Sequence, residues 1–182
     1  MRFWANLLGY QSVWFIVVWA AGSGRPGIGV AAALVFVLLQ AWASAQRASD
    51  ARLVVCALGL GVLIDGALAT GGLLRYASPT PALLAPAWIL TMWAAFAMTL
   101  NHSFAFLQQR IAWAVVVGAI GGPLAYVGAA RGFHAVAFVA PSWQATSVLA
   151  LGWALALPLL VRCAARWRRE RPANPIAVES RS

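Results

Sequence analysis

The chain has 182 residues, of which 63% are hydrophobic and only 9% are charged. A soluble monomer is excluded, because soluble domains carry about 25% charged residues to cover their surface. The formal net charge of +9 comes from 13 Arg and 4 acidic residues. Nucleic-acid binding is not indicated, because the arginines crowd behind an apolar segment and form no basic stripe with interleaved aromatic residues. The composition therefore predicts an all-α, polytopic transmembrane helical bundle.

Six apolar stretches follow one another along the chain. A hydrocarbon core about 30 Å thick requires about 20 apolar residues in a helix. Short breaks that contain Arg, Gly or Pro separate stretches of this length at 3–21, 27–45, 53–74, 87–108, 111–130 and 144–162. We expect these six spans to form one membrane domain over residues 1–163. Residues 164–182 are predicted to be a basic cytoplasmic tail without regular structure.

The arginines predict the orientation of the bundle. With six spans both termini lie on one side, and that side holds ten arginines against three on the other. Under the positive-inside rule, both termini are then cytoplasmic, and we expect a multi-pass protein of the bacterial inner membrane. Arginines behind the last span are expected to contact anionic lipids at the cytoplasmic face. They are Arg162, Arg166, Arg168, Arg169 and Arg171.

An acidic residue, Asp65, lies inside the third stretch, in the sequence Gly-Val-Leu-Ile-Asp-Gly. If this helix begins at residue 53, Asp65 lies about 18 Å from its cytoplasmic end, close to the middle of the membrane. Gly61 and Ala69 share its helix face, so a neighbouring helix can approach closely. Either Asp65 is functional or it is a protonated acid that hydrogen-bonds across a helix contact, and the sequence leaves both open.

The fourth stretch is the most polar of the six. Its candidate functional residues are Thr99, Asn101, His102 and Ser103. In a continuous helix, His102 lies about 9 Å from the cytoplasmic end, so we do not expect a direct ion pair with Asp65. His102 is a candidate for moving protons or binding a head group. The interpretation we favour is a neutral histidine that donates to a backbone carbonyl of another helix.

The fifth stretch combines close packing with a helix interruption. Gly118 and Gly122 form a G-x-x-x-G pair, which lets two helix backbones approach. Pro123 supplies no N–H to the carbonyl of Ala119, so we expect a kink there. A protonated Asp65 or the hydroxyl of Tyr126 could donate to that carbonyl. Gly122, Pro123 and Tyr126 are therefore candidates for a site, with a plain packing kink as the alternative.

The remaining segments carry few chemical signals. The loop from Arg75 to Pro86 contains Pro79 and Pro81 and is predicted to be a stiff cap over the bundle. No catalytic triad, zinc motif or CxxC pair occurs, so we predict neither a metal nor a cofactor.

Three blocks together resemble a known family. They are 61–66, the block 86–104 that reads Pro-Ala-Trp-Ile-Leu-Thr-Met-Trp-Ala-Ala-Phe-Ala-Met-Thr-Leu-Asn-His-Ser-Phe, and 118–128 with Gly-Gly-Pro-Leu-Ala-Tyr. The chain resembles the small bacterial multi-pass membrane proteins filed as domain of unknown function twenty-eight seventy-eight. The resemblance implies an inner-membrane location, no established activity and, through neighbouring genes, a link to lipid modification. The positions that it carries over are Asp65, Trp88, Trp93, Phe96, Leu100, Ser103, Gly122, Pro123 and Tyr126.

Three functions remain open at this point. The first is a polar cavity around Asp65 that binds or moves a lipid-like or small amphipathic molecule. The second is a membrane-embedded enzyme acting on lipid, with Asp65 as acid or base and His102 assisting. The third is a non-catalytic accessory subunit of a lipid-modifying system, bound through the arginine-rich tail.

Overall fold

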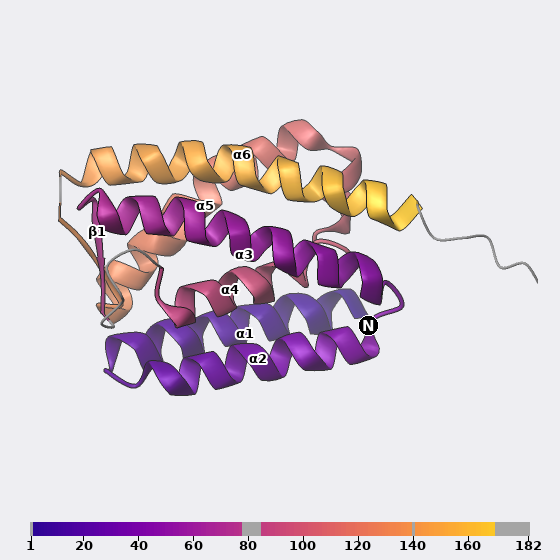
Figure 1. Ribbon diagram of the computed structural model, residues 1–182, viewed down its shortest axis with the longest axis horizontal. Helices are drawn as coiled ribbons and strands as arrows, with labels where there is room; N and C mark the ends of the chain where they lie inside the picture. The colour runs from indigo at the N-terminus through magenta and orange to yellow at the C-terminus, as the bar shows by residue number, and fades with distance from the viewer. Residues whose placement is uncertain (1, 78–84, 140, 170–182) are drawn as a thin grey trace, which may run out of the picture.

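The structure, a computed structural model, describes residues 2–77, 85–139 and 141–169 (Figure 1). Arg171 and most of the predicted tail lie outside the described residues, and so does most of the proline-rich loop. The described chain is almost entirely helical, with one short pair of strands. The elements are α1 (Arg2–Gly22), α2 (Pro26–Ala43), α3 (Arg47–Thr70), β1 (Leu74–Tyr76), α4 (Ala87–Ala97), the 3-10 helix η1 (Ala105–Gln109), α5 (Ile111–Phe133), β2 (Val136–Phe138) and α6 (Ser142–Arg169).

Of the six α-helices in the described part of the chain, five are long and apolar enough to cross a membrane: α1, α2, α3, α5 and α6. Their outward faces carry large apolar side chains. Trp42 is 77% exposed, Leu155 73% and Val55 70%. Water would not tolerate so much exposed apolar surface on a monomer, whereas hydrocarbon solvates it. The prediction of an all-helical protein of the membrane type is thus confirmed.

The prediction of a sixth continuous span over 87–108 is wrong. Helix α4 ends at Ala97 after 11 residues, a length of about 16 Å that is too short for the hydrocarbon core. Residues 98–104 form successive turns, and η1 follows them. This segment is rich in Thr, Asn, His and Ser, whose side chains compete with helical hydrogen bonds. Thr99, for example, donates its hydroxyl to the carbonyl of Phe96 at 2.6 Å.

A side chain from α1 holds this interruption in place. The Nδ2 atom of Asn6 donates to the carbonyl of Met98 at 3.1 Å, and its Oδ1 atom accepts the hydroxyl of Ser103 at 2.6 Å. The backbone N–H of Ser103 also donates to Oδ1 at 3.3 Å. Asn6 is 2% exposed. One buried carboxamide thus satisfies backbone groups that the broken helix leaves open.

Two further boundaries differ from the predicted ones. Helix α3 begins at Arg47, six residues before the predicted start, and ends at Thr70. Asp65 therefore lies about 27 Å from the start of α3 and about 8 Å from its end, not near its middle. Helix α6 continues to Arg169, so the predicted tail is helical over its first six residues.

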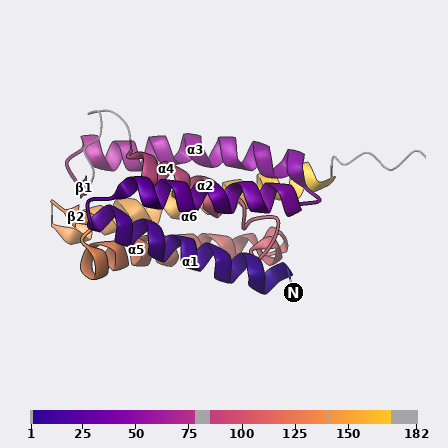
Figure 2. The ribbon, with the colours of Figure 1, turned by 90° about the horizontal axis from the view of Figure 1, so that it is seen from below.

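Helix α4 lies in the centre of the bundle, in contact with α1, α2 and α3. Helices α3 and α6 run side by side, and α5 packs against α6. The start of α1 and the end of α6 lie at the same end of the bundle (Figures 1 and 2). At the other end, β1 and β2 pair antiparallel with Tyr76 opposite Val136, a strand pair that the sequence analysis does not predict.

We predict that replacing Asn6 by Leu destabilises the protein by about 2–4 kcal/mol, because several buried groups around residues 98–103 lose their partner. Unfolding of detergent-solubilised protein, followed by circular dichroism, measures this change. Ser12→Ala on the exposed face of the same helix is the control. Equal stability of Asn6→Leu and wild type would show that Asn6 does not support the interruption.

Candidate functional site

Asp65 is the centre of a buried hydrogen-bond cluster. Its Oδ1 atom accepts the hydroxyl of Tyr76 at 2.6 Å and also the hydroxyl of Tyr126. Its Oδ2 atom accepts the indole N–H of Trp93 at 2.7 Å. Asp65 is 0% exposed. The four side chains come from α3, β1, α4 and α5, so one carboxyl group connects four elements.

Glycine positions bring these partners close. A Cβ atom on Gly61, one helical turn before Asp65, would lie 2.5 Å from Cδ1 of Trp93. The indole therefore reaches Asp65 only because residue 61 lacks a side chain, which confirms the predicted close approach on this helix face. Tyr126 follows Pro123 in α5, which is assigned as one helix through the proline. The sequence offered Asp65 and the Tyr126 hydroxyl as partners for the carbonyl of Ala119. In the structure these two groups bond to each other: the Tyr126 hydroxyl donates to Asp65.

The Tyr76 hydroxyl remains protonated and acts as a donor. Burial and the neighbouring Asp65 carboxylate both raise the pKa of Tyr76 far above its ordinary value, because each disfavours the phenolate. Tyr76 also packs edge-on against Trp88, with ring centroids 5.9 Å apart. Tyr76 thereby joins the short sheet to the last turns of α3 and the first turn of α4.

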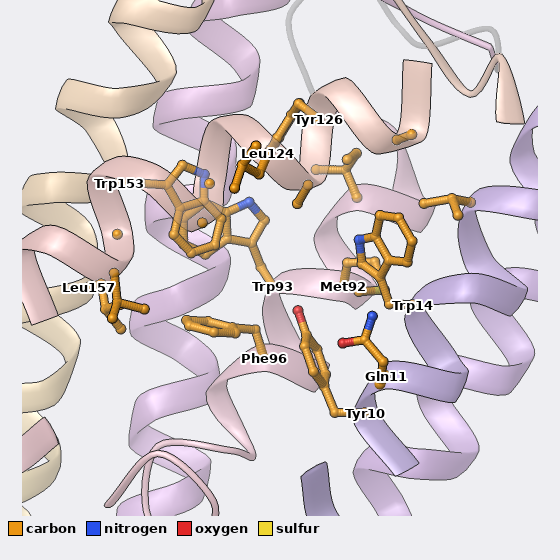
Figure 3. Close-up of a pocket in the computed structure, with 18 of the residues that line it drawn as sticks. Tyr10, Gln11, Trp14, Met92, Trp93, Phe96, Leu124, Tyr126, Trp153 and Leu157 are labelled. Atoms are coloured by element: carbon orange, nitrogen blue, oxygen red, sulfur yellow. The ribbon is translucent and has the colours of Figure 1, made fainter. Parts of the chain in front are cut away.

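A cavity of about 430 Å³ lies beside this cluster (Figure 3). Its walls come from α1, α4 and α5, with Trp153 and Leu157 of α6 at the back. The walls are mainly aromatic and aliphatic, and Asp65 does not line them. The expectation of a polar cavity around Asp65 is therefore corrected: the cavity is apolar, and Trp93 and Tyr126 form part of its wall in front of the acid.

The glycines of α5 shape the back of the cavity. Cβ atoms on Gly118 and Gly122 would lie 2.3 Å from the carbonyl oxygen and 2.4 Å from Cγ of Trp153. Trp153 consequently lies flat against α5, as the G-x-x-x-G pair predicts for a neighbouring helix. Its ring stacks on Trp93 with centroids 4.3 Å apart and an interplanar angle of 12°.

Two indole N–H groups near the cavity are covered by the protein and remain unpaired within the described part of the chain. Among the described residues, the Nε1 atoms of Trp88 and Trp153 are buried donors without a partner. A buried donor that lacks an acceptor costs about 1–3 kcal/mol. Both indoles line the cavity.

A second polar cluster surrounds Asp50 in the first turn of α3, at the other end of the bundle. Asp50 is 1% exposed and accepts the hydroxyl of Ser44 and the Nδ2–H of Asn101, the latter at 2.8 Å. Asn101 also donates to Ser49 Oγ at 2.9 Å. His102 Nε2 lies 3.4 Å from Asp50 Oδ2. The neighbour of His102 is thus a carboxylate rather than the backbone carbonyl that we favoured.

This second cluster extends to α6. Gln108 donates to Oδ1 of Asn101 at 3.2 Å and accepts from Arg168 at 3.2 Å. Arg168, predicted to lie at the lipid surface, is therefore partly used inside the protein, whereas the side chains of Arg162 and Arg166 are exposed. Asn101 and His102 belong to the Asp50 cluster, whereas Ser103 bonds to Asn6. The predicted site residues of the fourth stretch therefore fall into separate groups.

Several residues of these groups were not singled out from the sequence. Asp50 looked like part of a loop, because the predicted third span began at residue 53. Tyr76 lay in a predicted loop, and its partner β2 is sixty residues away. Tyr10 and Gln11, which line the cavity, belong to no recognisable sequence motif. The position of Asp50 does carry a signal. Acidic residues directly before an apolar run are enriched in the first turn of a helix, which would have predicted an earlier start for this helix.

A family model described as a protein of unknown function, DUF2878, matches residues 3–159, which is most of the chain. No curated protein and no solved structure matches the chain. The positions carried over from the resemblance include Asp65, Trp93 and Tyr126, which meet in one hydrogen-bonded cluster.

We predict that Asp65→Leu lowers the free energy of unfolding by at least about 3 kcal/mol, because three buried donors lose their acceptor. Asp65→Asn should cost less, since its amide oxygen still accepts. Chemical unfolding in detergent micelles, followed by circular dichroism, compares the two. Thr70→Ala is the control on the same helix, because Thr70 bonds only within α3. An unchanged stability of Asp65→Leu would contradict the role of Asp65 as a connector.

Proposed function

The chain belongs to the DUF2878 family of unknown function, and we propose that it is a membrane protein that binds an amphipathic, lipid-like molecule in the cavity between α1, α4 and α5. The observation that carries this proposal is the aromatic cavity. Its volume lies within the range of about 300–1,000 Å³ that is usual for small-molecule sites. Like such sites, it is mostly apolar with a few polar groups.

The rim of the cavity supports entry from the bilayer. Leu124 is 63% exposed, and Gln11 and Gly121 are also exposed. All three line the cavity, and they lie within the long apolar helices α1 and α5. An opening on this surface faces lipid when the helices span a membrane. A molecule dissolved in the bilayer then reaches the cavity by lateral diffusion, without passing through water.

We further propose a bacterial inner-membrane location with both termini in the cytoplasm. The start of α1, the α2–α3 connection, η1 and the end of α6 lie at one end of the bundle (Figure 1). The arginines of these segments outnumber those of the opposite end, where Arg25, Arg75 and Arg131 lie. The positive-inside rule assigns the arginine-rich end to the cytoplasm. Exposed Arg162 and Arg166 then lie close to anionic head groups.

Fusions at the C-terminus test this orientation. A green fluorescent protein fusion should fluoresce, and an alkaline phosphatase fusion should be inactive, because the phosphatase requires the oxidising periplasm. Fusions after Arg25 should behave in the opposite way. An active phosphatase at the C-terminus would reverse the proposed orientation.

Filling the cavity tests the proposed binding. A Cβ atom on Gly121 meets nothing within 4 Å, so the backbone at this rim position accepts a side chain, and we use Gly121→Leu to fill the rim. Three diazirine probes with the same single sixteen-carbon chain, an alcohol, a carboxylate and a lysophosphatidylcholine, are each photolysed with the protein in nanodiscs. For whichever probe labels the cavity peptides of wild type, we expect about tenfold less labelling of Gly121→Leu, which corresponds to about 1.4 kcal/mol.

Gly59→Leu is the matched control, because Gly59 is an exposed glycine of α3 that also has nothing within 4 Å and does not line the cavity. Its labelling should equal that of wild type. Equal labelling of the Gly121 and Gly59 variants, or no labelling of cavity peptides by any probe, would refute the proposed binding.

A further inference from the structure

We infer that the bound molecule carries an uncharged oxygen group, a hydroxyl or a carbonyl, which Tyr10 and Gln11 hold inside the cavity. This inference rests on the proposed function and names the class of its ligand: a neutral lipid with an apolar body and an uncharged oxygen-bearing head. It distinguishes such a molecule from fatty acids and phospholipids, whose heads carry charge.

The described wall of the cavity carries no charged side chain. Among the described residues that line the cavity, none is Asp, Glu, Lys, Arg or His. Asp65 lies outside the wall, and its oxygens already accept hydrogen bonds from Tyr76, Tyr126 and Trp93. A phosphate or carboxylate in this cavity would lose its water without gaining a counter-charge, which disfavours it strongly. The wall therefore selects against a charged head.

Two neutral polar side chains of α1, Tyr10 and Gln11, line the cavity. Tyr10 and Gln11 lie next to each other, and Figure 3 shows the hydroxyl of Tyr10 and the carboxamide of Gln11 directed toward the space in front of Trp93 and Met92. The Tyr10 ring is held by contacts with Phe36 and Phe96, at centroid distances of 6.5 and 5.9 Å. A hydroxyl and a carboxamide can each donate and accept. They match a neutral hydroxyl or carbonyl.

Indole rings form much of the apolar wall. Trp88 and Trp153 line the cavity, and Trp153 stacks on Trp93 with ring centroids 4.3 Å apart. The Nε1 atoms of Trp88 and Trp153 are covered by the protein itself. These rings therefore contact the apolar part of an occupant, and Tyr10 and Gln11 supply the polar contact for its head.

The three probes defined above test the inference, because they share one chain and differ only in the head. Labelling is carried out at alkaline pH, where the carboxylate probe is ionised. We expect the alcohol probe to label cavity peptides of α4 and α5 about tenfold more than the carboxylate or the lysophosphatidylcholine does. Equal labelling by all three, or a preference for a charged head, would overturn the inference while leaving binding in the cavity intact.

Two variants locate the head group. Tyr10→Phe and Gln11→Leu should each reduce labelling by the alcohol about threefold to tenfold, the effect of one lost hydrogen bond. Labelling by a diazirine alkane of the same length should not change, which excludes a folding defect. Gln109→Leu is the control for the glutamine, because Gln109 is exposed in η1 and does not line the cavity. Unchanged alcohol labelling in both variants would refute the assignment of Tyr10 and Gln11.

Discussion

The burial of one carboxyl group in a membrane bundle constrains most of this structure. Asp65 is fully buried, and its hydrogen-bond partners are uncharged donors from three other elements. Each of these bonds fixes more than the acid. Through Tyr76 the acid fixes the short sheet, and through Trp93 it fixes the ring on which Trp153 stacks. Tyr126 in turn lies in the wall of the cavity. The carboxyl group thus supports the cavity without taking part in it.

The interrupted fourth span is the second determinant. Because α4 stops at Ala97, the polar residues that follow it are directed to partners inside the protein. Asn6 satisfies one side of the interruption, and Asp50 satisfies the other through Asn101. Broken helices are tolerated at membrane depth only where they are buried in protein, and here α1 and α3 bury it. Asp65 and His102 consequently belong to different clusters, an arrangement that gives no support to a shared acid–base role.

The sequence predicts the helical membrane class and the family, because both depend on long apolar runs and on local blocks of residues. It also predicts the two glycine contacts, since small residues at helical spacing have a local signature. It does not predict the end of α4, because composition alone cannot tell whether Thr99 and Asn101 bond within a helix or away from it. The partners of Asp65 were partly hidden for a similar reason: Tyr76 lies in a strand whose pairing depends on residue 136. The cavity is a product of helix arrangement, and no local pattern encodes Tyr10 opposite Trp93.

During synthesis of the chain, Asp65 is made before the residues that donate hydrogen bonds to it. All three of its donors follow Asp65 in the sequence, and Tyr126 follows it by 61 residues. At about 5–20 residues per second, a ribosome needs about 3–12 s to cover that distance. During this interval α3 has already been made, whereas α5 has not. The nascent protein therefore carries an incompletely paired acid while it leaves the insertion machinery, and the bundle closes around Asp65 only when the fifth helix arrives.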